Sequence, residues 1–474
     1  MGLVDILSTI SKMLPEVKAP AKPVAIKEKI MWTVAALVIF FVMYNVTAFG
    51  VSPRVVTSDF LQVITASKLG SLLTVGIGPI VLASIFLQLF KGAGLINLDL
   101  SNPDQRKKFH EAQKVLAVLL AFLEAGIFVF TGRTILIDQT AMTAGLVILQ
   151  IALGAIILFY LDEIISKYGI GSGISLFIAA GVSLSIIGGL SSLIFGDNGV
   201  TQTLIGGGAD AIPSALLILL PFLFTVLVFL AVVYAEGMKV EIPVAYEAAR
   251  GIIPKLPLKF FYVSNIPVIF ASALLLNVQL FAAPLIGVLD SQNWTVGGQN
   301  IANYIGYVSS DKLLHDGALY LITPVFAAKG TLAHWNFLST ATTPIFGIPE
   351  WAHALIYIIF LIGTSIIFGV FWSETSGMDS KSVAGQLGSA GLQIPGYRRD
   401  PRLLEKVLEK YIGPLIITSS AAVGLLAGLA DLTGALGTGT GILLTVGIMY
   451  KLYEDFEKLQ VFDVYPQISG MFTD

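Results

Sequence analysis

The sequence predicts an all-α polytopic membrane protein. We expect ten transmembrane helices in two five-helix halves related by an inverted repeat, plus one re-entrant helix. Three observations predict this fold class. The 474 residues are 55% hydrophobic and 12% charged, with a mean hydropathy of +0.84, which lies outside the range of soluble domains. Ten apolar runs reach the length of about 17 to 25 residues that crosses a bilayer. Two pairs of phrases with glycine or proline breaks recur in corresponding runs.

Composition and motifs also exclude several classes of function. The chain has no cysteine, which excludes disulfides, thiolate chemistry and cysteine metal sites. Its four histidines, at 110, 315, 334 and 353, lack metal-ligand spacing. No glycine-rich phosphate loop followed by Lys-Ser/Thr is present, which argues against an ATP-driven pump. We therefore expect no metal, no cofactor and no enzymatic activity.

The first predicted element, within residues 1–27, is an amphipathic helix. Its apolar residues share one helical stripe, formed by Leu3, Ile6, Leu7, Ile10 and Leu14. Such a helix is expected to lie on the cytosolic membrane surface. Packing of the helix against the rest of the protein is an equally good interpretation.

The ten apolar runs follow this helix in two sets of five. Two shorter runs, 55–66 and 317–328, are too short to span and indicate re-entrant or interfacial pieces. The first half is expected over 28–191 and the second over 192–453, followed by a cytosolic tail over 454–474. The predicted spans lie near 30–49, 72–90, 115–131, 142–161, 171–191, 214–236, 260–282, 352–373, 411–430 and 435–453.

Lysine and arginine predict the orientation of the spans. One set of alternate loops holds 23 of the 28 basic residues and the other holds 5, which places both termini in the cytosol. The two longest cytosolic loops are then 237–259 and 374–410. Arg398, Arg399 and Arg402 lie in the second of these loops, where they suit a polyanion or anionic lipid headgroups.

The repeated phrases indicate a central pathway. GIGPIVLASIFLQL begins at Gly76 in the inward-running second span, and SNIPVIFASALLL begins at Ser264 in the outward-running seventh. GIGSGISLF at Gly169 and GTGTGILLT at Gly437 relate the fifth and tenth spans in the same way. Backbone freed by glycine or proline at membrane depth must be buried in protein or line a cavity. The residues that follow these breaks are apolar, which predicts a constriction that excludes water, with ordinary helix packing as the alternative.

Glu124 is the deepest clear ionisable residue within a span. Such a residue is a functional candidate by default, and Arg54 or Lys68 on the outer side is its expected partner. No second acid lies at a comparable depth, so we favour a structural carboxylate over a proton relay.

Taken together, YLDEIISKYGIGSGISLFIAAG (160–181), GIGPIVLASIFLQL, YVSNIPVIFAS and GALGTGTGILLTV closely resemble the SecY family, the pore subunit of the protein-conducting channel. The sequences of these motifs are most similar to those of archaeal members and of the alpha subunit of the endoplasmic-reticulum translocon. The resemblance implies a clamshell of two halves. It also implies a plug near 57–66 that includes Phe60, Leu61 and Ile64, and a pore ring formed by Ile77, Val81, Ile170, Ile174, Ile269 and Leu444. Leu444 lies two residues beyond Ile442, which the repeat would select.

The resemblance further implies a lateral gate between spans 2 and 3 on one side and spans 7 and 8 on the other. Its polar positions match Gln113 and Asn265, whereas Leu82 replaces a frequent threonine. Ribosome contacts would fall on the two large cytosolic loops, at Arg250, Lys255, Arg398 and Arg399. Members of this family often carry a run of basic residues just after the sixth span, and this sequence lacks it.

The function expected from this resemblance is passage of unfolded secretory polypeptides across the membrane and sideways release of transmembrane segments. The implied partners are small membrane subunits of SecE type and of beta or SecG type, a translating ribosome, signal sequences, nascent chains and membrane lipids. The implied location is the cytoplasmic membrane of an archaeal cell. The alternative function is a secondary transporter with five-plus-five inverted repeats, which the lack of paired midplane charges disfavours.

Overall fold

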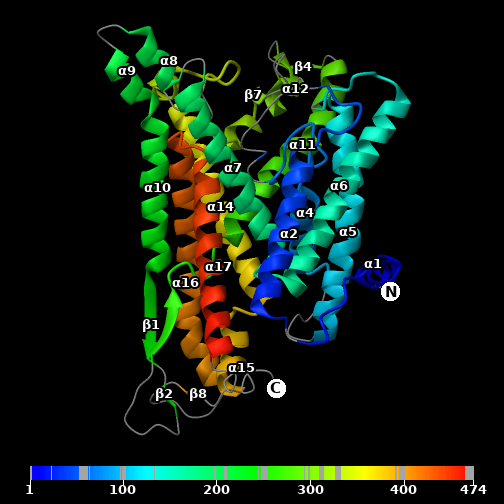
Figure 1. Cartoon of the computed structure of the whole chain (residues 1–474), viewed down its shortest axis with the longest axis vertical. Helices are drawn as coiled ribbons and strands as arrows, with labels where there is room; N and C mark the ends of the chain where they lie inside the picture. The colour runs from blue at the N-terminus through cyan, green and yellow to red at the C-terminus, as the bar shows by residue number, and fades with distance from the viewer. Residues whose placement is uncertain are drawn as a thin grey trace.

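The fold is a bundle of long helices, seen in a computed structural model of the whole chain (Figure 1). The structure describes residues 3–22, 24–52, 62, 65–96, 98, 103–132, 134–196, 199–207, 211–243, 245–246, 255–292, 294–296, 299–308, 314–325, 332–389, 392–393 and 401–464.

The first half supplies a surface helix and five long helices. A threonine caps one of them, since Thr143 N–H donates to Thr140 Oγ1 at 3.2 Å at the start of the fourth predicted span. The helices are α1 (Leu3–Ser11), α2 (Ile26–Asn45), α4 (Gly78–Gly92), α5 (Pro103–Phe130), α6 (Ala141–Tyr168) and α7 (Gly173–Phe195).

The second half contains the other five predicted spans and several short helices. The sixth predicted span is broken between Ile218 and Leu220, where Pro221 opens a new helix. The last helix continues to Val464, past residue 453, the predicted end of the tenth span. The elements are α8 (Val200–Gly206), α9 (Ala211–Ile218), α10 (Leu220–Gly237), α11 (Ile266–Ser291), α12 (Ile301–Ile305), η1 (Tyr320–Ile322), α13 (Leu332–Thr340), α14 (Glu350–Ser376), α15 (Ser380–Ser389), α16 (Pro401–Leu432) and α17 (Gly439–Val464).

Each of the ten predicted spans coincides with helical structure. Seven helical segments among the described residues are long and apolar enough to cross a membrane, and they contain α5, α6, α7, α10, α11, α14 and α16. The remaining predicted spans correspond to α2, the 15-residue α4 and α17. In Figure 1, α2, α4, α5 and α6 lie together on one side of the molecule, and α10, α14, α16 and α17 lie on the other.

The second span begins later than predicted. The run 72–90 was expected to be helical throughout, but α4 starts only at Gly78, with Pro79 in its first turn. Residues 65–77 fold as turns whose side chains are largely buried, with Ser67, Leu73 and Thr74 fully buried. This irregular backbone is satisfied by protein rather than by lipid, since Leu72 N–H donates to the Val46 carbonyl at 3.0 Å.

Short strand pairs occur only in the connections between the long helices, within the part of the chain that the structure describes. The hairpin of β1 (Lys239–Pro243) and β3 (Lys255–Lys259) projects from the lower end of the bundle in Figure 1. Next to it, β2 (Ala245–Tyr246) pairs with β8 (Leu392–Gln393), which joins the two large loops predicted to be cytosolic. Two further pairs are β4 (Thr295–Val296) with β5 (Gln299–Asn300), and β6 (Tyr307–Val308) with β7 (Leu314–Asp316).

The backbone repeats between the two halves as the sequence predicts. Gly76, two residues before α4, has φ +59°, and Ser264, two residues before α11, has φ +58°. The next residues also match, with φ and ψ of −85° and −2° at Ile77 and −90° and 0° at Asn265. A left-handed residue, a bridge-region residue and a proline therefore start both helices.

Candidate functional site

The six predicted ring residues lie in the interior of the bundle. Ile77 and Leu444 are fully buried, Val81, Ile170 and Ile269 are 5–8% exposed, and Ile174 is half-buried. Five of the six belong to, or pack against, one hydrophobic cluster, and Ile170 lies outside it.

This cluster joins the two halves of the molecule. It includes Phe40 of α2 and Phe177 of α7 from the first half, and Tyr357 of α14 and Leu443 of α17 from the second. The rings of Phe40 and Phe177 stack with centroids 5.1 Å apart. Residues of the predicted ring from both halves therefore share one buried apolar cluster.

A small cavity lies next to the constriction. Its volume is about 50 Å³, and its lining includes Ser172, Ser175, Asn265, Ile269 and Lys451. A single water needs about 10–15 Å³, so the cavity has room for a few waters. Ile269 of the predicted ring thus borders a partly polar cavity.

The predicted plug residues Phe60, Leu61 and Ile64 lie outside the described residues. The chain that follows them reaches the ring directly. Ala66 is fully buried in the hydrophobic cluster that contains most of the predicted ring residues. The Ile77 N–H donates to the Thr65 carbonyl oxygen at 2.9 Å. The end of the predicted plug segment is therefore anchored at the constriction.

The predicted gate residues do not meet in the structure. Gln113 of α5 donates to Ser84 Oγ of α4 at 2.5 Å, so it bonds within the first half. Asn265 donates to Glu236 Oε1 at 3.4 Å and to the Leu443 carbonyl at 3.2 Å, so it faces α10 and α17. Their shared role as a polar latch stays a prediction that no described contact supports.

The seam between the predicted gate walls is formed by apolar contacts. Helix α11 contacts α4 and α5, and α14 contacts α4. Phe281 of α11 packs on a cluster that contains Leu82 of α4 and Leu120 of α5. Further along, a Cβ at Gly92 of α4 would lie 2.6 Å from Cε1 of Phe371 of α14. Leu82, which replaces the frequent threonine, is thus part of an apolar seam.

Glu124 of α5 places its carboxylate at the start of α4. A Cβ at Gly78 would lie 2.8 Å from Glu124 Oε2, and Glu124 Oε1 has no hydrogen-bond partner among the described residues. Lys68 donates instead to Asn45 Oδ1 at 3.2 Å, and Arg54 lies outside the described residues. Whether Glu124 is a satisfied structural carboxylate stays a prediction, because Arg54, one of its expected partners, lies outside the described residues.

The predicted ribosome contacts lie almost entirely outside the described residues. This applies to Arg250, Arg398 and Arg399. Lys255 is described as the first residue of β3, where it pairs with Pro243 of β1. The hairpin that carries Lys255 projects from the bundle (Figure 1).

One of the histidines, His353, makes two structural contacts. His353 is fully buried at the start of α14, with Nδ1 2.8 Å from Glu350 Oε2 and Nε2 2.9 Å from the Thr323 carbonyl oxygen. Tyr320 of η1 donates to Glu350 Oε1 at 3.2 Å. No group of residues within the described ranges has the arrangement of a metal site.

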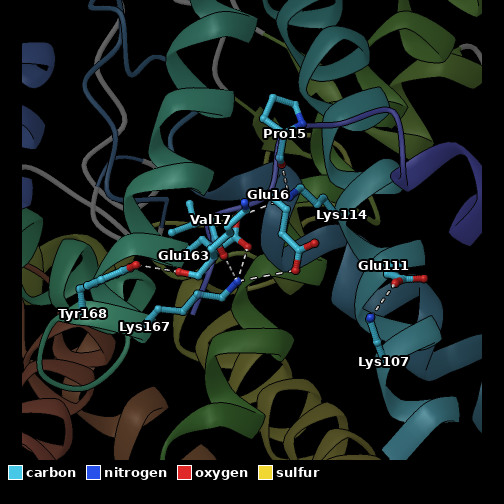
Figure 2. A network of polar contacts seen from close by, with 10 residues as sticks. Pro15, Glu16, Val17, Lys107, Glu111, Lys114, Glu163, Lys167 and Tyr168 are labelled. Atoms are coloured by element: carbon cyan, nitrogen blue, oxygen red, sulfur yellow. Dashed lines mark hydrogen bonds and ion pairs between the residues drawn. The ribbon is translucent and has the colours of Figure 1, made fainter. Parts of the chain in front are cut away.

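The N-terminal segment is fixed to the bundle by a network of polar contacts, shown in Figure 2. Lys114 of α5 donates to the Pro15 carbonyl at 2.6 Å and pairs with Glu163 of α6 at 3.4 Å. Lys167 of α6 pairs with the same Glu163 at 2.9 Å and donates to the Val17 carbonyl oxygen. This segment therefore links the ends of α5 and α6.

Helix α1 packs against the protein and also has an outward face. Val4 is buried in a cluster with Leu87 and Phe109. Ile6 and Ile10 are 48% and 44% exposed. The buried face of α1 is therefore compatible with packing against the protein, and its exposed face is compatible with a place on the membrane surface.

The comparisons with known proteins agree with this architecture. The family model of SecY matches residues 71–453. The protein translocase subunit SecY of Methanocaldococcus jannaschii is 42% identical over 466 residues, which covers 98% of this chain and 99% of the relative.

Two solved structures share the fold across 98% of this chain and 99% of theirs. One is a SecY protein whose plug domain is described as stabilising the closed state of the translocation channel and maintaining a membrane seal, with TM-score 0.78 and 39% identity. The other is Sec61 in a canine ribosome-channel complex from the endoplasmic reticulum, with TM-score 0.76 and 40% identity. On these matches, the chain belongs to the SecY family.

Proposed function

We propose that this chain is the pore-forming subunit of a protein-conducting channel, which passes unfolded secretory polypeptides across the membrane. One observation carries the proposal: apolar side chains from both halves meet in one buried cluster at the centre of the bundle. The SecY relative named as a protein translocase subunit supports the same function. The chain acts as a passive channel, and the energy comes from a partner.

The ring provides the seal in this proposal. Ile77, Val81 and Ile269 close the pathway because a narrow apolar constriction excludes water and the ions that need it. A translocating polypeptide pushes these side chains apart and takes their place. The plug segment adds a second closure, for which the seal attributed to the plug domain of the related SecY gives support.

The lateral gate opens along the apolar seam between α4 and α5 on one side and α11 and α14 on the other. A signal sequence or transmembrane segment enters this seam and reaches the lipid. The apolar contacts of Leu82 and Phe281 suit such a ligand, because an apolar helix replaces them without leaving polar groups unpaired.

We further propose the orientation and the partners. The bias of 23 basic residues against 5 supports cytosolic termini, in the cytoplasmic membrane of an archaeal cell. The ribosome complex of the related Sec61 supports docking of a ribosome on the two large cytosolic loops, including Arg250, Lys255, Arg398 and Arg399. Small membrane subunits of SecE type and of beta or SecG type complete the assembly.

The first experiment uses the absence of native cysteine. One variant, Ile174→Cys, carries its cysteine at the ring, and a matched control, Ile187→Cys, carries it on the same helix at a site that is 64% exposed. Ribosome-bound nascent chains with one cysteine are arrested during translocation and tested for disulfide crosslinks. We expect a signal-dependent crosslink only to position 174.

The secondary transporter makes the opposite prediction. No ring position would then crosslink to the nascent chain, and a small solute would protect the ring cysteine from modification. Such a result would replace the channel function with the transporter.

A further inference from the structure

At the start of each of two helices that carry ring residues, a backbone N–H donates to an aspartate of the preceding helix. At the start of α7, the Ile174 N–H donates to Asp162 Oδ1 of α6 at 2.8 Å. At the start of α17, the Thr440 N–H donates to Asp431 Oδ1 of α16 at 2.9 Å. Both contacts cross from one helix to its successor, once in each half of the molecule.

These carboxylates satisfy groups that lack another partner. The first N–H groups of a helix have no acceptor within the helix, and Ser172, the residue that flanks α7, makes no capping bond with its side chain. A carboxylate near a helix start accepts these bonds and also interacts favourably with the helix dipole. Where little water reaches, the neighbouring helix must supply this acceptor.

The two contacts are equivalent in the inverted repeat. Each helix starts with a glycine at a close approach: a Cβ at Gly173 would lie 2.5 Å from Asp162 Cα, and a Cβ at Gly439 would lie 2.0 Å from the Ala430 carbonyl carbon. Two residues before each of these glycines, the backbone is left-handed, with φ +75° at residue 171 and +74° at residue 437.

Each carboxylate acts close to a ring side chain. Ile174 is itself a ring residue, and its own backbone N–H makes the bond to Asp162. Leu444 lies one helical turn after Thr440. Asp431, which is 3% exposed, also accepts the Tyr357 hydroxyl of α14 at 2.8 Å, so it connects three helices. The start of each helix, and with it the ring side chain, is fixed to the surrounding helices.

We infer that Asp162 and Asp431 are positioning residues of the constriction. By holding the starts of α7 and α17, they place Ile174 and Leu444 where these side chains close the pathway. This inference rests on the proposed sealing function of the ring. It adds two polar residues, outside the ring, that the closed state requires.

The test compares Asp162→Ala, Asp162→Asn and Thr140→Ala in the full chain reconstituted in planar bilayers. Asn keeps an oxygen that accepts the Ile174 N–H, whereas Ala removes it. Thr140→Ala removes a cap from the start of α6, which carries no ring residue. We expect resting ion conductance to rise about tenfold in Asp162→Ala, the factor that corresponds to a lost cap worth about 1.4 kcal/mol. We expect a smaller rise in Asp162→Asn and none in Thr140→Ala.

Asp431→Asn and Asp431→Ala repeat the comparison in the other half, and thermal unfolding of every variant measures stability separately. Unchanged conductance in Asp162→Ala, or equal conductance in Thr140→Ala, would overturn the inference. If Asp162→Ala does not fold, the conductance of Asp431→Ala, which removes the equivalent acceptor in the other half, decides: a rise supports the inference and wild-type conductance overturns it. Crosslinking of nascent chains to Ile174→Cys tests the channel function independently of these aspartates.

Discussion

Replacement of Ile77 by alanine is predicted to unseal the resting channel. Ile77 is fully buried within the central cluster, so its truncation is expected to cost about 2–5 kcal/mol in the closed conformation. If the open conformation does not pack this side chain, the equilibrium between closed and open channels shifts by the same free energy. At about 1.4 kcal/mol for each factor of ten, the open fraction rises between roughly 30-fold and several thousand-fold.

The structure offers a closely matched control in Ile85. It is also fully buried, belongs to the same cluster and lies two turns further along α4, but it is not a ring residue. Ile85→Ala should lose a similar free energy of unfolding, since the same atoms are removed from the same core. Comparison of the two variants therefore separates an effect on conductance from a general loss of stability.

The assay is single-channel recording in planar bilayers without a translocation substrate, together with thermal unfolding of both variants. We expect both variants to unfold more easily and only Ile77→Ala to conduct ions at rest. Equal conductance of the two variants would show that leakage follows general loss of packing. The assignment of Ile77 to a sealing ring would then be wrong.

Three further predictions concern the backbone, the loops and the cytosolic side. Gly76→Ala should destabilise strongly, because φ is +59° and the new Cβ would lie 2.0 Å from a backbone carbonyl oxygen; thermal unfolding measures the loss. His353→Ala should cost about 1–3 kcal/mol of unfolding free energy in chemical denaturation, since it removes a hydrogen-bond partner of the buried Glu350, which keeps the Tyr320 hydroxyl. A denaturation midpoint equal to that of the wild type would show that His353 and Glu350 do not form a tight pair. Burial, together with Asp379, raises the pKa of Tyr262 to about 12. The folded chain therefore binds this proton more tightly than the unfolded chain, so the stabilisation is complete below pH 10 and is lost towards pH 12. Difference absorbance between wild type and Tyr262→Phe follows the titration, and ionisation near pH 10 would contradict it.

The fold was accessible from the sequence because its signals are local. Apolar runs of spanning length and the glycine and proline breaks both lie within single elements, and each predicted span proved helical. The pairing of Gly76 with Ser264 was also correct, down to matching left-handed backbone at both positions. Even so, the start of the second span was predicted six residues too early, because apolar residues of an irregular, buried segment extend the run.

Features that depend on distant partners were not accessible in the same way. Aligning GIGSGISLF with GTGTGILLT pairs Ile174 with Ile442, whereas the helix starts pair Ile174 with Thr440, two residues earlier. At these helix starts, the N–H groups of Ile174 and Thr440 donate to aspartates on other helices. Gln113 and Asn265 were likewise selected by motif, but their hydrogen bonds stay within separate halves. No local sequence pattern indicates which distant residue such a side chain contacts.

The proposed ring and the proposed gate share one hydrophobic core, which on this proposal constrains how the channel opens. The cluster that contains Ile77 and Ile269 also includes Leu361 and Phe368 of the gate helix α14. Movement of α14 away from α4 therefore disturbs the packing of the ring, so opening the gate sideways and widening the pore are coupled. An apolar helix that enters the seam restores buried contacts on both walls, whereas a polar segment leaves them exposed to water or unpaired groups. On the proposed function, selection of hydrophobic signal segments and opening of the seal thus depend on the same set of contacts.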